Sequence, residues 1–144
     1  MLRQASVRMQ SRVLTAAQIT ELAGVSPTRY VNVGDPVSSR LSDGPRHKVT
    51  TWSRSSMESS DVLADHVVAL QPILNVVGRV RQADPELYVD IVIMLEAASL
   101  GAMIDVEAAH VALLARAGCG IVIDAYEADS PERVQAGEGR VEFR

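Results

Sequence analysis

The sequence predicts an α+β fold, with a ferredoxin-like βαββαβ core, an added C-terminal helix and strand, and helices packed on a mainly antiparallel sheet. Its 144 residues suit one domain with a real core and are too few for two ordinary domains. Segments with a two-residue apolar period alternate with segments of helical period, in the order strand, helix, strand, strand, helix, strand, helix, strand. We therefore expect a single α+β domain over residues 1–128. Residues 129–144, with Pro, two Gly and scattered charge, suggest a flexible C-terminal tail.

The first third of the chain predicts two strands around a short helix. Apolar and polar residues alternate over 7–13, which is typical of a strand with one buried face. Thr15 and Gln18 have the spacing of a capping box that opens a helix, and Gly24 suits the left-handed position that closes it. Alternation returns over 29–33 and predicts the second strand.

A loop and a third strand follow. The turn formers at 34–36 end the second strand, and residues 37–46 show neither period, so they predict a loop. Residues 47–54 return to alternation and predict the third strand.

The longest predicted helix follows the third strand. Ser60 or Asp61 can cap it, and its apolar residues cluster on one side of a helical wheel. Pro72 lies inside this pattern. We therefore expect either a kink near Gln71 or two abutting helices with Pro72 in the first turn of the second.

The last third predicts a strand, a helix and a strand. Residues 87–95 are apolar on both faces except Asp90, as in a central strand covered on both sides. Asp105 begins the third helix, Gly118 closes it, and residues 121–126 form the last strand. The residues that we expect to be buried together are Leu70, Ile91, Ile93 and Leu113.

Charge is unevenly distributed along the chain. The formal net charge is −4, yet residues 1–60 hold eight Lys or Arg and four Asp or Glu, whereas residues 61–144 hold six and fourteen. Two oppositely charged faces of one domain explain this asymmetry better than a binding tail. The acidic balance argues against a surface that coats nucleic acid or anionic lipid.

Cysteine content and hydropathy indicate the compartment. Cys119 is the only cysteine, so an internal disulfide is excluded, and the chain has no secretory h-region and no apolar run of membrane-spanning length. We expect a soluble, cytoplasmic protein.

Several motifs resemble those of the bacterial domain-of-unknown-function family 4279. The resemblance spans residues 19–129 and includes a helix that ends in Gly before Pro-Thr, a Gly-Asp after the next strand and a Trp-Ser strand. The resemblance implies no catalytic residues, and it suggests a cytoplasmic accessory or immunity-type protein. The matching positions are Pro27, Thr28, Gly34, Asp35, Trp52, Pro72, Asp124 and Tyr126.

No group of residues favours catalysis. His66 lies on the apolar stripe of the long helix, where a hydrogen-bonded core histidine is favoured over a base or metal ligand. His110 and Glu107 form a pair without a nucleophile, and Cys119 lies in a Gly-Cys-Gly turn. We predict no catalytic residue, no metal site and no cofactor, so the chain is expected not to be an enzyme. The acidic residues considered for a cation and set aside are Asp124, Glu127 and Asp129.

A basic and aromatic group remains as the candidate binding site: Arg29 and Tyr30 on the second strand, Trp52 and Arg54 on the third. Arg and Trp often dominate protein interfaces. For Trp52 a core position with its N–H satisfied locally is the favoured alternative. We therefore expect a non-catalytic domain that binds a protein partner, with a homo-oligomer left open. A small-molecule or nucleotide sensor is the second hypothesis, and a small enzyme is the third.

Overall fold

The computed structural model describes residues 1–41, 43–98 and 101–128. The tail expected over 129–144 lies outside the described residues. The described elements follow the expected order. They are β1 (Leu2–Ser11), α1 (Ala16–Ala23), β2 (Arg29–Val31), β3 (Thr50–Ser55), α2 (Leu63–Ala83), β4 (Tyr88–Ala97), α3 (Ala108–Arg116) and β5 (Gly120–Glu127).

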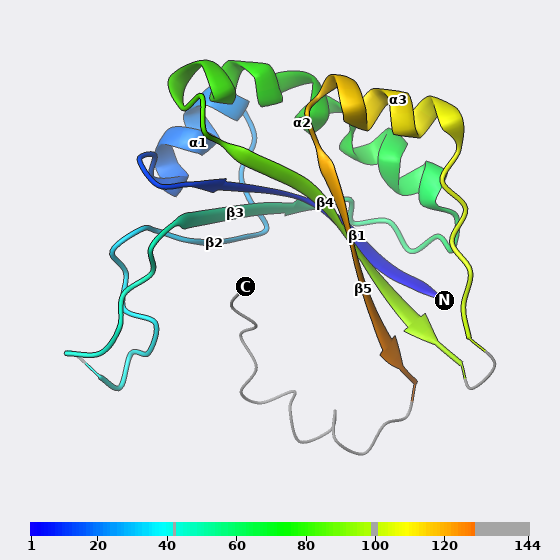
Figure 1. Ribbon diagram of the computed structural model, residues 1–144, viewed down its shortest axis with the longest axis horizontal. Coiled ribbons are helices and arrows are strands. Elements are labelled where there is room, and N and C mark those ends of the chain that lie inside the picture. Colours follow the sequence, from blue (N-terminus) through cyan, green and yellow to red (C-terminus); the bar gives the residue numbers. More distant parts are fainter. Residues whose placement is uncertain (42, 99–100, 129–144) are drawn as a thin grey trace.

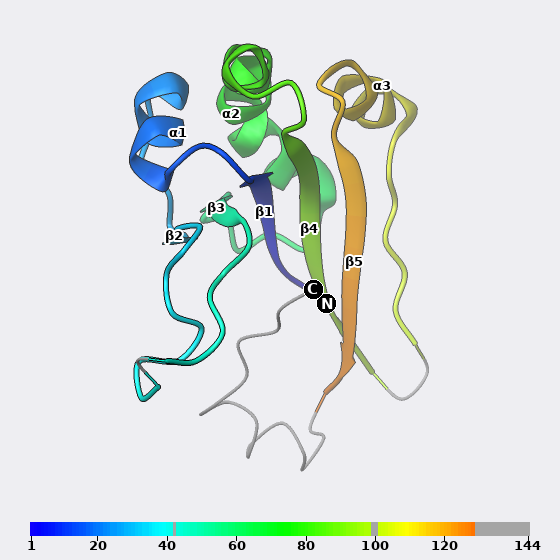
Figure 2. The ribbon, with the colours of Figure 1, turned by 60° about the vertical axis from the view of Figure 1, so that its left-hand side comes forward.

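The strands form one five-stranded sheet in the order β2-β3-β1-β4-β5. Neighbouring strands are antiparallel except β4 and β5, which are parallel. Helices α1, α2 and α3 lie over the same face of this sheet, as Figures 1 and 2 show. The α+β class and the mainly antiparallel sheet are thus confirmed.

The core lies between the helices and one face of the sheet. Its largest fully buried side chains include Met9, Leu70, Ile91 and Ile93, so three of the four residues expected to be buried together are in one cluster. Leu113 is partly buried and packs against this cluster. Within the described residues, no helix is both long and apolar enough to cross a bilayer.

Strand β1 covers Leu2–Ser11, whereas the sequence predicted residues 7–13, so the strand begins and ends earlier than expected. The Ser11 hydroxyl accepts hydrogen bonds from the backbone N–H of Val13 and Leu14 and donates to the Asp84 carboxylate. These bonds turn the chain out of the sheet and leave Val13 exposed.

The two ends of α1 are formed as the sequence predicts. The Thr15 hydroxyl accepts from the Gln18 backbone N–H, and the Gln18 side chain accepts from the Thr15 backbone N–H. Gly24 follows the helix with φ of 72° in the left-handed region. The capping box and the glycine end are confirmed.

The β2–β3 pair is shorter than the expected strands over 29–33 and 47–54. Beyond this pair, side chains accept the hydrogen bonds that would otherwise join the two strands. Asp35 accepts from the Asn32 backbone N–H, and the Thr50 hydroxyl accepts from the Val33 backbone N–H. The described residues of the intervening loop project beyond the sheet (Figure 2).

Helix α2 is one helix of 21 residues that contains Pro72, so the alternative of two abutting helices is wrong. Proline frees the carbonyl of Val68, one turn earlier. Val68 is 64% exposed, and water can satisfy this carbonyl on the solvent side. The expected cap at Ser60 or Asp61 is also wrong, because the helix begins after Val62, which makes no side-chain capping bond.

Helix α3 begins at Ala108, three residues after the expected start at Asp105. Glu107, which directly precedes the helix, still has an extended backbone, with φ of −66° and ψ of 149°. At the other end, Gly118 has φ of 61°, as a helix-closing glycine should. The Arg81 guanidinium donates to the carbonyls of Ala117 and Gly118 and so binds the end of α3 to α2.

Candidate binding face

The sheet has a second face that no described helix covers, and we call it the open face (Figure 2). Strand register assigns side chains to it, because paired residues in neighbouring strands share a face. Arg8 pairs with Ser53 on one side and Asp90 on the other, while their sequence neighbours Val7 and Met9 are buried in the core. The open face is therefore mainly polar. Its members on the central and left-hand strands include Arg29, Thr51, Ser53, Arg8 and Gln10.

An ion pair lies at the centre of the open face. The Arg8 guanidinium donates to both oxygens of Asp90, from Nε at 2.9 Å and from an Nη at 2.5 Å. Asp90 is fully buried, whereas the Arg8 side chain is 23% exposed. This two-pronged geometry satisfies a carboxylate that would otherwise be buried without a partner. The pair joins β1 to β4 and fixes the floor of the open face.

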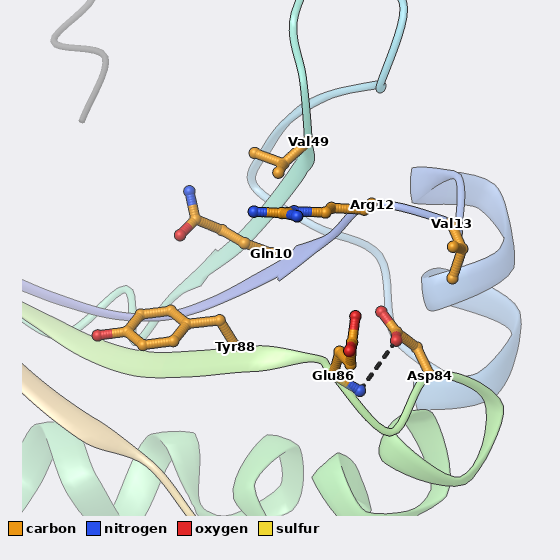
Figure 3. A pocket seen from close by; sticks show the side chains of 7 residues that line it. All are labelled: Gln10, Arg12, Val13, Val49, Asp84, Glu86 and Tyr88. Carbon is orange, nitrogen blue, oxygen red and sulfur yellow. Dashed lines mark hydrogen bonds between the residues drawn. The ribbon is translucent and has the colours of Figure 1, made fainter.

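A shallow hollow of about 460 Å³ lies where β1 ends and β4 begins (Figure 3). Arg12 extends over it from one side, and Tyr88 and Glu86 lie on the opposite side. The Asp84 carboxylate is held in place because it accepts from the Ser11 hydroxyl and from the Glu86 backbone N–H. The hollow thus presents the Arg12 guanidinium, the Tyr88 phenol and the Glu86 carboxylate to solvent, whereas Asp84 is buried with both carboxylate oxygens engaged. Gln10, Val13 and Val49 complete its lining.

The structure brings the four predicted binding residues onto adjacent strands but divides them between the two faces. Trp52 is fully buried on the helix face, and its Nε1–H donates to the Thr20 hydroxyl of α1 at 3.1 Å. This is the core position that the sequence offered as the alternative. Tyr30 pairs with Trp52 and shares its face, but it is 57% exposed.

The two arginines of this group lie on opposite faces. Arg54 pairs with core residue Val7, and its guanidinium donates to the Ser26 carbonyl on the helix face. Arg29 pairs with Ser53 and is exposed on the open face. One flat partner surface therefore cannot contact both arginines from the same side.

The histidine on α2 is structural. His66 is fully buried, with Nδ1 at 2.6 Å from the Ser56 hydroxyl and Nε2 at 2.7 Å from the Ser60 carbonyl. Both ring nitrogens are engaged, so the ring ties the segment before α2 to the helix. The expected hydrogen-bonded core histidine is confirmed.

Cys119 is a poor nucleophile in this structure. Burial, and next the nearby Asp90 carboxylate, raise the pKa of its thiol to about 12. The reactive thiolate is therefore scarce near neutral pH. His110 does not complement it, since no hydrogen bond is found for the buried His110 Nδ1. Within the described ranges, no three His, Cys, Asp or Glu side chains are grouped as metal ligands would be.

Comparison with protein families places the chain. The family described as Domain of unknown function (DUF4279) matches residues 2–128, which contain all eight helices and strands of the described part of the chain. The chain belongs to the DUF4279 family. No curated protein and no solved structure matches it.

In this DUF4279 member, the structure also exposes two side chains that were not among the four predicted residues. Arg12 and Tyr88 are both exposed at the hollow, next to the open face. The alternation that the sequence shows over residues 7–13 already places Arg8, Gln10 and Arg12 on one side, so their common side could be predicted from the sequence. The meeting of Arg12 with Tyr88 depends on β1 pairing with β4, for which the sequence gives no register.

Proposed function

We propose that this DUF4279 member acts by binding a protein partner on its open face, as a bacterial cytoplasmic protein of accessory or immunity type. The observation that carries the proposal is the uncovered polar face of the sheet. All three described helices cover the opposite face, and exposed Arg and Tyr side chains, which dominate many interfaces, lie on or beside the open one. The single cysteine supports the cytoplasmic location.

The charges of the open face indicate the kind of partner. Arg12 and Arg29 provide exposed positive charge from the β1 and β2 side. Glu86 lies across the hollow and Asp124 on β5, so the opposite side is acidic. A partner with carboxylates opposite the arginines and basic groups opposite β4 and β5 would match this pattern. Charge complementarity of this kind speeds association and selects the partner more than it adds affinity.

Two features support binding over catalysis. The candidate nucleophile, Cys119, has a raised thiol pKa, and His66 has both ring nitrogens engaged in the core. General acid–base or covalent catalysis needs groups whose pKa is moved toward the working pH. The two residues considered for catalysis, Cys119 and His66, thus belong to the buried interior.

We extend this proposal to the architecture: β1 to β4 with α1 and α2 are a ferredoxin-like core to which α3 and β5 are added. The strand order β2-β3-β1-β4 with antiparallel neighbours supports it. In this arrangement the two core helices lie on one face and leave the other for contacts.

The experiment identifies the partner and then tests the face. A photocrosslinking amino acid at Thr51, on the open face, is expected to capture the partner in cells, whereas the same group at Val68, exposed on α2, is not. The captured protein is then purified and its affinity measured against the wild-type chain. Equal capture from both positions would contradict the assignment of the face.

Charge reversal supplies the quantitative test. The double variant Arg12→Glu, Arg29→Glu is expected to weaken the complex at least tenfold at low salt and to reduce its salt dependence. The matched control, Arg79→Glu with Arg116→Glu, reverses two exposed helix charges and should bind as the wild type. Equal affinity of the two double variants would remove the open face from the interface, and turnover of a metabolite by the pure protein would refute a binding-only role.

A small-molecule sensor is the second candidate, and the hollow favours it. Its volume of about 460 Å³ falls within the range of ligand pockets. Arg12, with Tyr88 and the Glu86 carboxylate, suits a zwitterionic ligand such as an amino acid. Such a ligand should raise the Tm of the wild type but not of Arg12→Gln, and no shift with any zwitterion at millimolar concentration would exclude it.

A further inference from the structure

The outer edge of β5 carries unpaired backbone groups whose positions follow from the register. The Ala128 N–H donates to the Ala97 carbonyl at 2.9 Å, so residue 128 points toward β4. The β4–β5 register is constant from Asp90↔Gly120 to Ala97↔Glu127. Because N–H and C=O groups alternate in direction along a strand, the odd-numbered residues point outward. The outward groups belong to Ile121, Ile123, Ala125 and Glu127.

Apart from the carboxylates of Asp124 and Glu127, this edge lacks the features that protect edge strands. Residues 120–127 contain no Lys, Arg or Pro, and the register has no bulge. Ile121 and Ile123 are 43% and 48% exposed, although both lie on the helix face. In contrast, the opposite edge strand, β2, has three residues and carries Arg29. No described strand pairs with the outer side of β5.

We propose that two copies of the chain pair through β5 as antiparallel strands, with the two-fold axis at Ile123. Paired residues must share a face, so a residue of odd number pairs with another of odd number. An axis at Asp124 would set two carboxylates directly opposite each other, which is unfavourable. An axis at Ile123 sets Ile123 opposite Ile123 and Ile121 opposite Ala125, and it places Asp124 opposite Val122 and not opposite the other Asp124.

An axis at Ala125 would set Ile123 opposite the Glu127 carboxylate, which is unfavourable for an apolar side chain. Backbone bonding then selects between the registers centred on Ile123 and Val122. With the axis at Ile123, three residues of each strand, Ile121, Ile123 and Ala125, exchange hydrogen bonds with the other copy. With the axis at Val122, only Ile121 and Ile123 do so, because the partner of Ala125 would be Cys119, whose N–H already donates to Leu114. The Ile123 register therefore satisfies more of the edge.

The size of this contact suits a weak, specific dimer. The eight residues of β5 make an edge about 26 Å long at roughly 3.3 Å per residue, and the sheet with its helix layer is about 20 Å thick, which gives on the order of 1,000 Å² for both copies. This value is at the lower limit for specific interfaces, so we expect a Kd in the micromolar range. The open face stays free in such a dimer.

Residue-resolved hydrogen exchange of the full chain tests the geometry. In dilute samples the amides of Val122, Asp124 and Tyr126 should be protected and those of Ile121, Ile123 and Ala125 unprotected. At concentrations where sedimentation shows a dimer, the second set should gain at least tenfold protection. A chain that stays monomeric up to roughly 1 mM would overturn the proposal.

The same experiment separates the other occupants of the edge. Protection of Ile121, Ile123 and Ala125 at every concentration would show that another part of the chain covers β5. Protection that appears only when a different protein is added would assign the edge to a foreign strand. Either outcome refutes self-pairing.

Charge swapping tests the position of the axis. Ile123→Lys and Ile123→Glu are each expected to be monomeric, because like charges would meet at the axis, and their mixture should dimerise. Val68→Lys, a change at an exposed position on α2, should leave the wild-type dimer intact. Circular dichroism and Tm check that each variant folds. A mixture that fails to dimerise, or a lysine variant as dimeric as the wild type, would show that Ile123 does not face its counterpart.

Discussion

At the residue scale, the ion pair between Arg8 and Asp90 is the feature most sensitive to change. A buried carboxylate needs a partner, and Arg8 supplies two hydrogen bonds from 82 positions away in the chain. The attraction between the two charges is offset by the cost of removing them from water. Removing one partner is therefore expected to be far more damaging than removing both.

We predict that Arg8→Met lowers the free energy of unfolding by about 3 kcal/mol, because Asp90 is left buried and unpaired. The double variant Arg8→Met, Asp90→Leu should recover most of that loss. Urea unfolding of the wild type, both single variants and the double variant measures the coupling. Additive effects would contradict the dependence of Asp90 on Arg8.

Cys119 gives a prediction that depends on pH. Burial raises the pKa of its thiol from 9.0 to about 12 in the folded state, so the unfolded chain loses this proton first. Stability that is present below pH 9 is therefore lost as the pH rises from 9 to 12. The wild type should lose more stability over this interval than Cys119→Ala, and iodoacetamide should label the native thiol at least tenfold more slowly than the unfolded one. Parallel pH profiles for the two proteins would refute the shift.

At the element scale, two glycines separate backbone strain from packing. Gly24 ends α1 with φ of 72°, and Gly78 lies inside α2. A Cβ at either position would meet nothing within 4 Å. Any effect of alanine at these positions must then come from the backbone.

We predict opposite signs for the two alanine substitutions. Gly24→Ala should destabilise by about 1 kcal/mol, because an L-residue is strained in the left-handed region. Gly78→Ala should stabilise by about 0.5 to 1 kcal/mol through helix propensity. Thermal unfolding of both variants measures the difference, and shifts of Tm in the same direction would contradict this account.

The buried side of α2 supplies the element's attachment to the sheet. Leu70 is 1% exposed, whereas Val68 on the same helix is 64% exposed. Leu70→Ala should cost about 2 to 5 kcal/mol and Val68→Ala less than about 1 kcal/mol. An unchanged urea midpoint for Leu70→Ala would remove this residue from the core.

At the scale of the whole molecule, the features that the sequence predicted correctly are those that depend on residues close together in the chain. The capping box of α1, the positive φ of Gly24 and the buried hydrogen-bonded His66 all depend on local patterns. The class and the element order followed from the same patterns. These features use residues within about one or two turns of each other, where propensity and side-chain chemistry act directly.

What the sequence did not predict depends on pairing between distant segments. Arg29 and Arg54 were expected to share a surface, but the register of β2 and β3 sets them on opposite faces. The second and third strands are shorter than predicted. The Asp35 and Thr50 side chains accept hydrogen bonds from the backbone N–H groups of Asn32 and Val33, which a longer strand pair would use. Apolar periodicity contains no information about such competition.

The central place of β1 in the sheet has a consequence for synthesis of the chain. Its neighbours, β3 and β4, are made later, and the residues of β4 that pair with it follow by about 80 to 90 positions. At roughly 5–20 residues per second, β1 waits about 4 to 18 s on the ribosome before its second edge can be covered. During this interval Val7 and Met9 have no core to enter, so the nascent chain offers a chaperone an extended apolar segment that the finished protein hides completely.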